Sequence, residues 1–298
     1  MLGHSFPTRR SSDLGHLVGS YAINFGYIGA NASFYLQHPT CYDEAGAFDT
    51  SIGIRLFGYI ADTFIDDAEV GRVNIGIQID GRDTDGAAVT IGRGPAAHQD
   101  VRLSNCVVDS VSVAGLDIRD LNRSGQVSIN DLYVAPASAK AIGIRIHGID
   151  PGASIDFTAG KLLGIGGTGV AVSGAVNISM RGTYLREFGK PIVLDKVAGG
   201  LFEPKIYNAS HPVGIAAIEA IDSHRTSYKP RIAGAEAMLQ AGVSLDERCS
   251  HSSVDPTMID PACLKARSAA YKVRYGAADA RTSPAFTTSG NVLTGALA

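Results

Sequence analysis

The feature that most constrains this chain is a short strand pattern that returns at nearly regular intervals. The clearest copy is Ile52–Gly58, where a glycine precedes apolar residues that alternate with variable ones. Five strong copies and three weaker ones begin at Ile52, Ile75, Ala114, Ile142 and Thr168, and at Lys190, Val213 and Ala241. Their second positions are 22 to 28 residues apart, except for one interval of 39. A self-similar period of this size predicts a solenoid.

Each repeat contains further short strands besides this anchor strand. Between the copies at Ala114 and Ile142, Val127–Ile129 and Leu132–Val134 both alternate apolar and polar residues, and Asn, Asp, Gly and Ser separate the runs. Such alternation places apolar side chains on one face of a strand. Three short strands per coil predict an all-β chain folded as a single-stranded parallel β-helix of about eight coils. A propeller blade, at about 40–50 residues, is too long for this period.

Coil length, polar turns and the Gly-Ile-x-Ile anchor resemble the right-handed parallel β-helix of the pectin-lyase-like superfamily, over roughly Ala47 to Met258. That superfamily includes polysaccharide lyases, polygalacturonase-type hydrolases and bacteriophage tailspikes. The resemblance implies an extracellular or virion-associated protein that binds and degrades an acidic polysaccharide, as a lyase or a glycoside hydrolase. The alternative is a non-catalytic tailspike, fibre or adhesin module, and the tailspike resemblance further implies a homotrimer.

The organisation expected along the chain has four parts. Residues 1–14 are interpreted as a non-native scar, because the run Ser5–Leu14 resembles a translated sequencing-adapter peptide, so that a natural N-terminus is expected to be missing. Residues 15–48 form an entry or cap, residues 49–258 the β-helix, and residues 259–298 a tail or the start of a further segment. A disulfide between Cys249 and Cys263 remains open, because spacing alone does not establish a bridge.

Composition excludes several classes of function. The 298 residues carry a net charge of −3, which gives no basic footprint for nucleic acid. No run reaches the 18 or more apolar residues of a membrane span. The chain also lacks a P-loop, a dinucleotide fingerprint and a Gly-x-Ser-x-Gly elbow.

The variable positions of the anchor strands predict where a site lies. They point away from the core and stack at about 4.8 Å from coil to coil. In the middle coils this gathers five candidate catalytic residues: Asp80, Asp117, Arg119, Arg145 and His147. Neighbouring positions and the long 39-residue interval add candidates for substrate binding: Arg55, Gln78, Arg82, Asp83 and Asp85.

These residue types suit two reactions on an acidic polysaccharide. For β-elimination, Arg119 or Arg145 would neutralise the substrate carboxylate while His147 removes the C5 proton. A metal can also neutralise that carboxylate, so Ca²⁺ is left open, although no cofactor is indicated with certainty. Hydrolysis would instead use Asp80 and Asp117 as a pair of carboxyl groups.

A structural interpretation competes with both reactions. Alternating Asp and Arg on an exposed sheet form surface ion pairs, each contributing about 0–1 kcal/mol. A purely binding module would then use tyrosines instead: Tyr59, Tyr133, Tyr184 and Tyr207.

Overall fold

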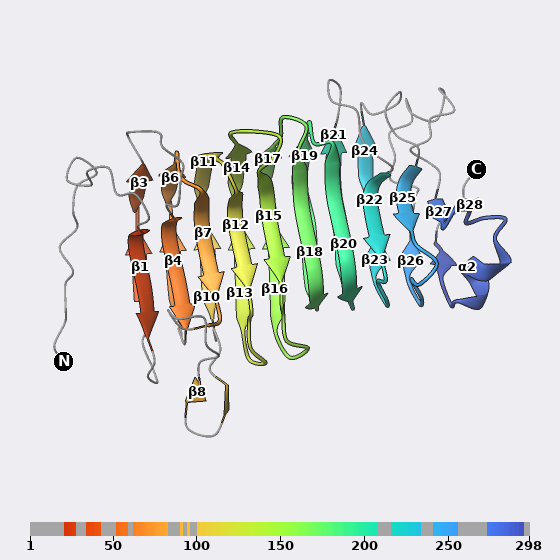
Figure 1. Cartoon of the computed structure of the whole chain (residues 1–298), viewed down its shortest axis with the longest axis horizontal. Coiled ribbons are helices and arrows are strands. Elements are labelled where there is room, and N and C mark those ends of the chain that lie inside the picture. The colour runs from red at the N-terminus through yellow and green to blue at the C-terminus, as the bar shows by residue number, and fades with distance from the viewer. Residues whose placement is uncertain are drawn as a thin grey trace.

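The computed structural model describes residues 21–27, 34–42, 52–58, 62–82, 90–91, 94–95, 100–207, 216–233, 241–255 and 273–294. They form a parallel β-solenoid of about seven turns, consistent with the right-handed parallel β-helix expected (Figure 1). Successive coils stack along one axis from the N-terminal to the C-terminal side of the molecule. In this described part of the chain, no helix has the length and apolar character that crossing a membrane requires.

The recurring anchor strands line up side by side in one sheet, here called the anchor sheet. In spatial order its strands are β1 (Tyr21–Tyr27), β4 (Ile52–Gly58), β7 (Ile75–Asp80), β12 (Ala114–Arg119), β15 (Ile142–His147), β18 (Thr168–Val176), β20 (Lys190–Ala198), β22 (Ala216–Ile221), β25 (Ala241–Leu245), β27 (Val273–Tyr275) and β28 (Ala278–Asp279). All of these neighbours pair in parallel except β27 and β28, which form an antiparallel hairpin.

The second and third strands of the coils belong to a second sheet. The second strands are β2 (Phe34–Gln37), β5 (Thr63–Asp66), β10 (Val101–Ser104), β13 (Gln126–Asn130), β16 (Ser154–Thr158), β23 (Ser227–Tyr228) and β26 (Ser253–Val254). The third strands are β3 (Thr40–Tyr42), β6 (Glu69–Gly71), β11 (Val107–Val111), β14 (Tyr133–Pro136), β17 (Lys161–Leu163) and β24 (Arg231–Ala233). Two longer strands, β19 (Ile178–Arg186) and β21 (Leu201–Tyr207), pair with both sets and join them. At the C-terminal end β29 (Val292–Leu293) pairs with β26.

Stacked aliphatic side chains build the core. On β12, Leu116 and Ile118 are fully buried, and each lies opposite an isoleucine of β7 and of β15. The same alternation repeats in every anchor strand from β4 to β25, so one continuous apolar core runs along the solenoid. Burial of this kind contributes about 25 cal/mol per Å² of apolar surface removed from water.

The anchor glycine has a steric cause. A Cβ atom on Gly115 would lie 2.3 Å from Cγ1 of Val134, in the third strand of the same coil, and 2.7 Å from the carbonyl oxygen of Gly143 in the next coil. Gly53 and Gly76 face a valine of their own coil at 2.2 Å in the same way. The position must therefore be small wherever the first and third strands of a coil approach each other.

One predicted repeat has the wrong register. The pattern at Val213 suggested an anchor strand there, but β22 begins at Ala216, and its Ile218 lies opposite Ile192 of β20 and Val243 of β25. Ala217 thus occupies the place of the anchor glycine, next to a fully buried isoleucine. With this correction the intervals on the two sides of this repeat, from Pro191 to Ala217 and from Ala217 to Gly242, are 26 and 25 residues.

The long interval and the C-terminal end depart from the plain coil. Within the interval, β8 (Thr90–Ile91) and β9 (Gly94–Pro95) pair in a small antiparallel hairpin that extends away from the stack (Figure 1).

After β28, the short helix α2 (Pro284–Thr288) places Phe286 against Tyr275, with the ring centroids 5.7 Å apart. Both rings are buried, so this end covers core side chains that an open solenoid would expose.

Candidate functional site

The structure brings together all the residues proposed for catalysis. They lie on three neighbouring strands of the anchor sheet, β7, β12 and β15: Asp80, Asp117, Arg119, Arg145 and His147. The two expected columns are present in register, with Arg55, Gln78, Asp117 and Arg145 in one, and Phe57, Asp80, Arg119 and His147 in the other. This part of the site was predictable because a strand's side-chain period is two residues.

The exposure of these columns differs from the prediction. Asp117 is 0% exposed, Asp80 and Gln78 are 1% exposed, and Arg55 is 5% exposed, although the sequence placed them all on an open face. The physical reason is that long arginine side chains from neighbouring coils lie over the shorter carboxylates and neutralise them. The site is therefore a buried ion network with a partly exposed rim.

Asp117 is the centre of the first half of this network. It accepts hydrogen bonds from Nε2 of Gln78 at 2.9 Å and from Nε of Arg145 at 2.8 Å, and Nε2 of His147 lies 3.6 Å from its Oδ1. Burial by itself raises the pKa of Asp117. The contact with His147, the hydrogen bonds from Arg145 and Gln78 and the charge of Arg145 outweigh burial, so the pKa lies well below its usual range.

Asp80 is the centre of the second half. Arg119 binds its Oδ2 through Nη2 at 2.6 Å and Nε at 2.8 Å, and Nη2 of Arg55 lies 3.7 Å from the same oxygen. Arg82, which follows directly after β7, donates its backbone N–H to Oδ1 at 3.0 Å and holds Nε 3.3 Å away. Arg82 also reaches Asp120, with Nε 2.9 Å from Oδ2. Three guanidinium groups thus surround one buried carboxylate.

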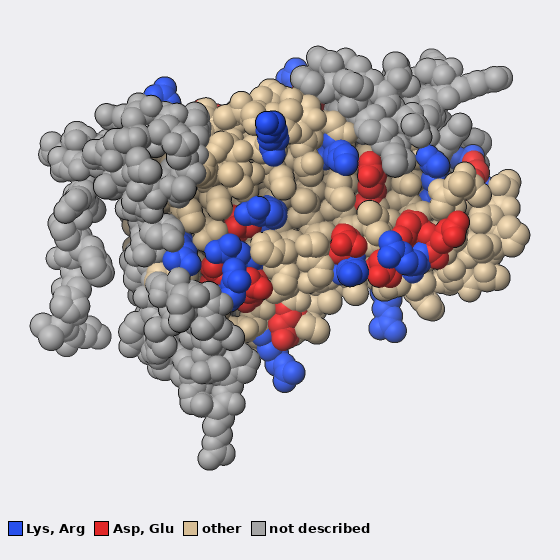
Figure 2. All heavy atoms as spheres, viewed as in Figure 1, with Lys and Arg blue, Asp and Glu red and all other residues tan. Residues whose placement is uncertain are grey.

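The rim of the network is cationic. The side chains of Arg119, Arg145 and His147 are 24%, 30% and 35% exposed, whereas the carboxylates behind them are not. Counting Arg55, Arg82, Arg119 and Arg145 against Asp80, Asp117 and Asp120, four guanidinium groups face three carboxylates. Figure 2 shows acidic and basic side chains intermixed in two groups, one over the earlier coils and one over the last coils.

The remaining residues that the sequence suggested for binding lie either within the network or outside the described residues. Gln78 links the halves, because its Oε1 accepts from Nε of Arg55 at 3.2 Å and from Nη2 of Arg119 at 3.3 Å. Asp83 and Asp85 lie outside the described residues, as does Tyr59.

A Ca²⁺ ion does not fit this arrangement. Calcium takes six to eight oxygen ligands, which carboxylates usually supply. The oxygens of Asp80 and Asp117 are already directed at guanidinium and amide donors, whose charge a cation would oppose. Among the residues that the structure describes, no group of three or more His, Cys, Asp or Glu side chains could hold a metal ion.

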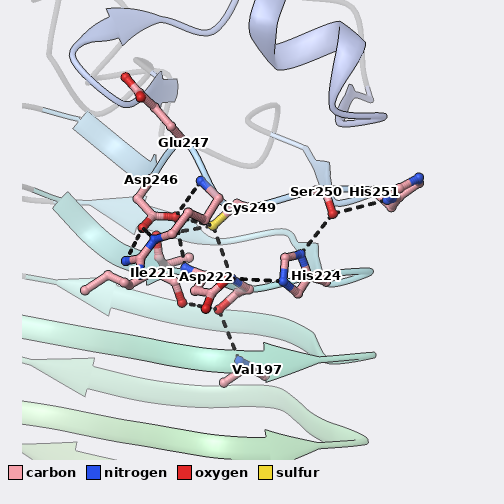
Figure 3. A network of polar contacts seen from close by, with 12 residues as sticks. Val197, Ile221, Asp222, His224, Asp246, Glu247, Cys249, Ser250 and His251 are labelled. Carbon is pink, nitrogen blue, oxygen red and sulfur yellow. Dashed lines mark hydrogen bonds and ion pairs between the residues drawn. The ribbon is translucent and has the colours of Figure 1, made fainter.

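A second polar cluster, which the sequence pattern did not predict, lies at the turns of the last coils. Nε2 of His224 is 3.3 Å from Oδ1 of Asp222, and its Nδ1 is 2.9 Å from Oγ of Ser250 in the next coil (Figure 3). Nδ1 of His251 lies 3.2 Å from the same hydroxyl. The signal that could have revealed the cluster is an Asp-x-His pair followed by a serine one coil, or 26 residues, later.

The order carboxylate, imidazole and hydroxyl is also that of a nucleophilic triad, which additionally requires donors for an oxyanion. Here the nearby backbone amides are already used between coils. The N–H of Ser250 is donated to the carbonyl of Ser223, that of His251 to Ser289, and that of Arg225 to Ser250. We therefore interpret the cluster as a polar ladder that holds neighbouring turns together.

Cys249 belongs to the interior side of this ladder. Its thiol is free and buried, lies 3.4 Å from the backbone nitrogen of Ser223 and 3.3 Å from Oδ1 of Asp246, and burial raises its pKa to about 12. Cys263, considered as its disulfide partner, lies outside the described residues. Cys249 thus acts as a packed, unreactive side chain.

Comparison with known proteins adds no relative to this picture. No protein-family model, no curated protein and no solved structure matches the chain.

Proposed function

We propose that this protein binds an acidic polysaccharide at the rim of the network, where Arg119 and Arg145 supply positive charge and His147 lies beside them. The observation that carries the proposal is that each rim side chain is partly exposed yet held from behind by a buried carboxylate. Long side chains normally lose conformational freedom when they bind a ligand. Here Asp80 and Asp117 already fix the guanidinium groups, so less freedom is lost on binding.

The chemistry of the rim favours a carboxylated sugar. A guanidinium group presents two parallel N–H donors that match a carboxylate, and this geometry gives specificity as well as energy. Arg145 directs Nε at Asp117, which leaves both of its Nη groups for a ligand. Arg119 directs Nε and Nη2 at Asp80 and Gln78, which leaves its Nη1 group. The resemblance of the coils to the pectin-lyase-like superfamily supports the same ligand class. Such a ligand would place the protein outside the cell or on a virion, where a homotrimer of the tailspike kind is one arrangement.

One observation favours catalysis as a second function. His147 lies opposite Arg119 in the register and 3.6 Å from Asp117, so a carboxylate orients the imidazole next to a cation. In β-elimination, His147 would take the C5 proton of a uronate while the C4–O bond breaks, and the departing oxygen would take a proton from solvent. The products would be a C4–C5 double bond and a new chain end.

The geometry gives less support to hydrolysis. A glycoside hydrolase needs one carboxyl group that stays protonated to act as general acid. Asp117 has a lowered pKa, and both Asp117 and Asp80 are buried beneath guanidinium groups. Neither reaches a substrate oxygen without breaking the network.

The test is affinity electrophoresis of the purified chain in gels that contain polygalacturonate, alginate or, as a neutral control, dextran. Wild-type protein should be retarded by the acidic polymers alone. Arg145→Gln should weaken this retardation about tenfold, whereas Arg102→Gln, which removes an exposed arginine of the second sheet, should leave it unchanged. Equal behaviour of the two variants, or no retardation of the wild type, would overturn the proposal.

Elimination is tested on the same polymers. A lyase generates an unsaturated product that absorbs in the ultraviolet, together with new reducing ends. His147→Ala should abolish both while binding persists. New reducing ends without ultraviolet absorbance would contradict elimination. If neither signal appears, the protein binds the polymer without cleaving it.

A further inference from the structure

A second surface of the molecule, on the third strands of the coils, carries a different arrangement of charge. Cα pairing aligns one outward-facing residue from each of β14, β17, β19, β21 and β24: Tyr133, Lys161, Tyr184, Lys205 and Arg231. We call this line the tyrosine–lysine column. A parallel neighbouring line on the same strands is Leu163, Arg186, Tyr207 and Ala233.

The column faces solvent. On each strand, the residue that directly follows the column residue is buried in the core. These residues are Val134, Leu162, Leu185, Ile206 and Ile232. Alternation along each strand therefore turns the column outward. Lys161, Lys205 and Arg231 are exposed, and Tyr133 and Tyr184 are half-buried with one part of the side chain accessible.

The charges of the column are not neutralised as those of the anchor sheet are. No carboxylate in the described part of the chain forms an ion pair with Lys161, Lys205 or Arg231. In the neighbouring line, Arg186 lies over the ring of Tyr207, 5.7 Å from its centroid, and its Nε is 3.9 Å from Glu187, which precedes the turn. The two lines hold four cationic side chains and no acidic one, on a chain whose net charge is −3.

We propose that the tyrosine–lysine column is a second binding surface, on which an acidic polysaccharide lies along the axis of the solenoid. Adjacent coils are about 4.8 Å apart, so the column from Tyr133 to Arg231 extends over roughly 19 Å. A linear polymer on this line meets one side chain per coil. Tyrosine rings offer flat, partly apolar faces to sugar rings, and the lysines between them pair with carboxylates.

The length and composition of the column favour a linear acidic polymer over other ligands. A compact ligand would touch only one or two coils and would not use the length of the column. Protein–protein interfaces are depleted of lysine relative to the rest of the surface, whereas two of the five column residues are lysines. That the polymer is a polysaccharide rests on the proposed function, but the surface itself is argued independently of the anchor-sheet rim.

The experiment compares two matched double variants of the full chain. Lys161→Gln/Lys205→Gln removes two charges from the column, and Lys140→Gln/Lys196→Gln removes two exposed charges elsewhere. In polygalacturonate gels the column variant should bind about threefold to tenfold more weakly, and the control variant should bind as the wild type does. Tyr184→Ala keeps the charge and should weaken binding about twofold to tenfold even at high salt, because stacking is not screened. Unchanged melting curves would show that all variants fold.

The length of the ligand provides a second measurement. Affinity for oligogalacturonides should rise with length until the oligomer covers the column, and then level off. Equal affinity for short and long oligomers would overturn the proposal, as would equal binding by the two double variants. Stronger retention of the wild type by single-stranded DNA than by polygalacturonate would overturn the ligand class.

The proposals for the two binding surfaces can be refuted independently of each other. Loss of binding in the column variant with normal binding by Arg145→Gln would support the column and refute the anchor-sheet rim. The reverse pattern would refute the column and leave the proposed function in place. No retardation of the wild-type protein by any acidic polymer would refute both.

Discussion

Substitution of Asp117 by asparagine tests whether the buried network stabilises the fold. Asn has nearly the same shape, so the change removes the negative charge and turns one acceptor oxygen into a donor. In the structure Asp117 accepts from Gln78 at 2.9 Å and from Arg145 at 2.8 Å. After the substitution one of these donors must face an N–H₂ group.

The expected magnitude follows from the bonds that are lost. A hydrogen bond that involves a charged group contributes about 1.5–3 kcal/mol, and removing one partner of a fully buried pair costs about 3–5 kcal/mol. Arg145 is 30% exposed and recovers part of its hydration, which lowers the upper limit. We therefore expect Asp117→Asn to reduce the free energy of unfolding by about 2–4 kcal/mol at neutral pH.

The lowered pKa of Asp117 determines how this difference in stability changes with pH. The pKa of Asp117 is lower in the folded protein than in the unfolded chain, so its stabilising effect is complete above the unfolded value of about 4. That effect is lost only as the pH falls from about 4 through the lower folded pKa. The difference between wild type and Asp117→Asn should therefore stay constant from neutral pH to about pH 4 and shrink below it.

Urea denaturation followed by circular dichroism measures this difference, with Asp156→Asn as the control. Asp156 is an exposed aspartate on β16, and its replacement should change stability by less than about 0.5 kcal/mol. If Asp117→Asn loses no more stability than Asp156→Asn, the network makes no net contribution. A difference that persists undiminished in strong acid would also refute the reasoning.

Three further predictions concern the solenoid itself. Gly115→Ala should cost about 2–3 kcal/mol in urea denaturation, because the new Cβ would lie 2.3 Å from Val134, and an unchanged midpoint would contradict this steric account. Phe286→Ala should remove about 3 kcal/mol of packing against Tyr275 and lower hydrogen-exchange protection mainly in the last coils, whereas a uniform loss would argue against a local cap. Native wild-type protein and Cys249→Ser should take up equal amounts of a thiol reagent at mildly alkaline pH, since burial raises the pKa of this thiol to about 12, and excess labelling of the wild type would show that it is accessible.

Much of the fold could be predicted because the relevant interactions are periodic. The alternation around Asp117 fixes which residues face the core, and the recurring anchor motif fixes which residues of the next coil lie opposite. The pairing of Asp117 with Gln78 and Arg145 follows from aligning the copies of this motif, even across the 39-residue interval.

The parts that could not be predicted depend on side-chain volume and on contacts between coils. Val213 and Ala216 begin equally plausible local patterns, and only the stacking of Ile218 on Ile192 selects the second. The burial of Asp80 depends on Arg82 turning back over it, which no period indicates. His224 finds Ser250 only once the last coils are in register.

The two proposed surfaces differ in how many coils of the solenoid a ligand can contact. On the anchor sheet each carboxylate attracts the arginines of adjacent coils, so the charges cancel locally and only a short rim remains for binding. In the column on β14 to β24, the residues that stack from coil to coil include three cations and no carboxylate, and none of these cations forms an ion pair within the described residues. Every further coil then adds a contact of similar size, so binding strength grows with the length of the ligand until the column ends. A chain with this geometry distinguishes linear polymers from their monomers chiefly by length, and this preference needs no pocket.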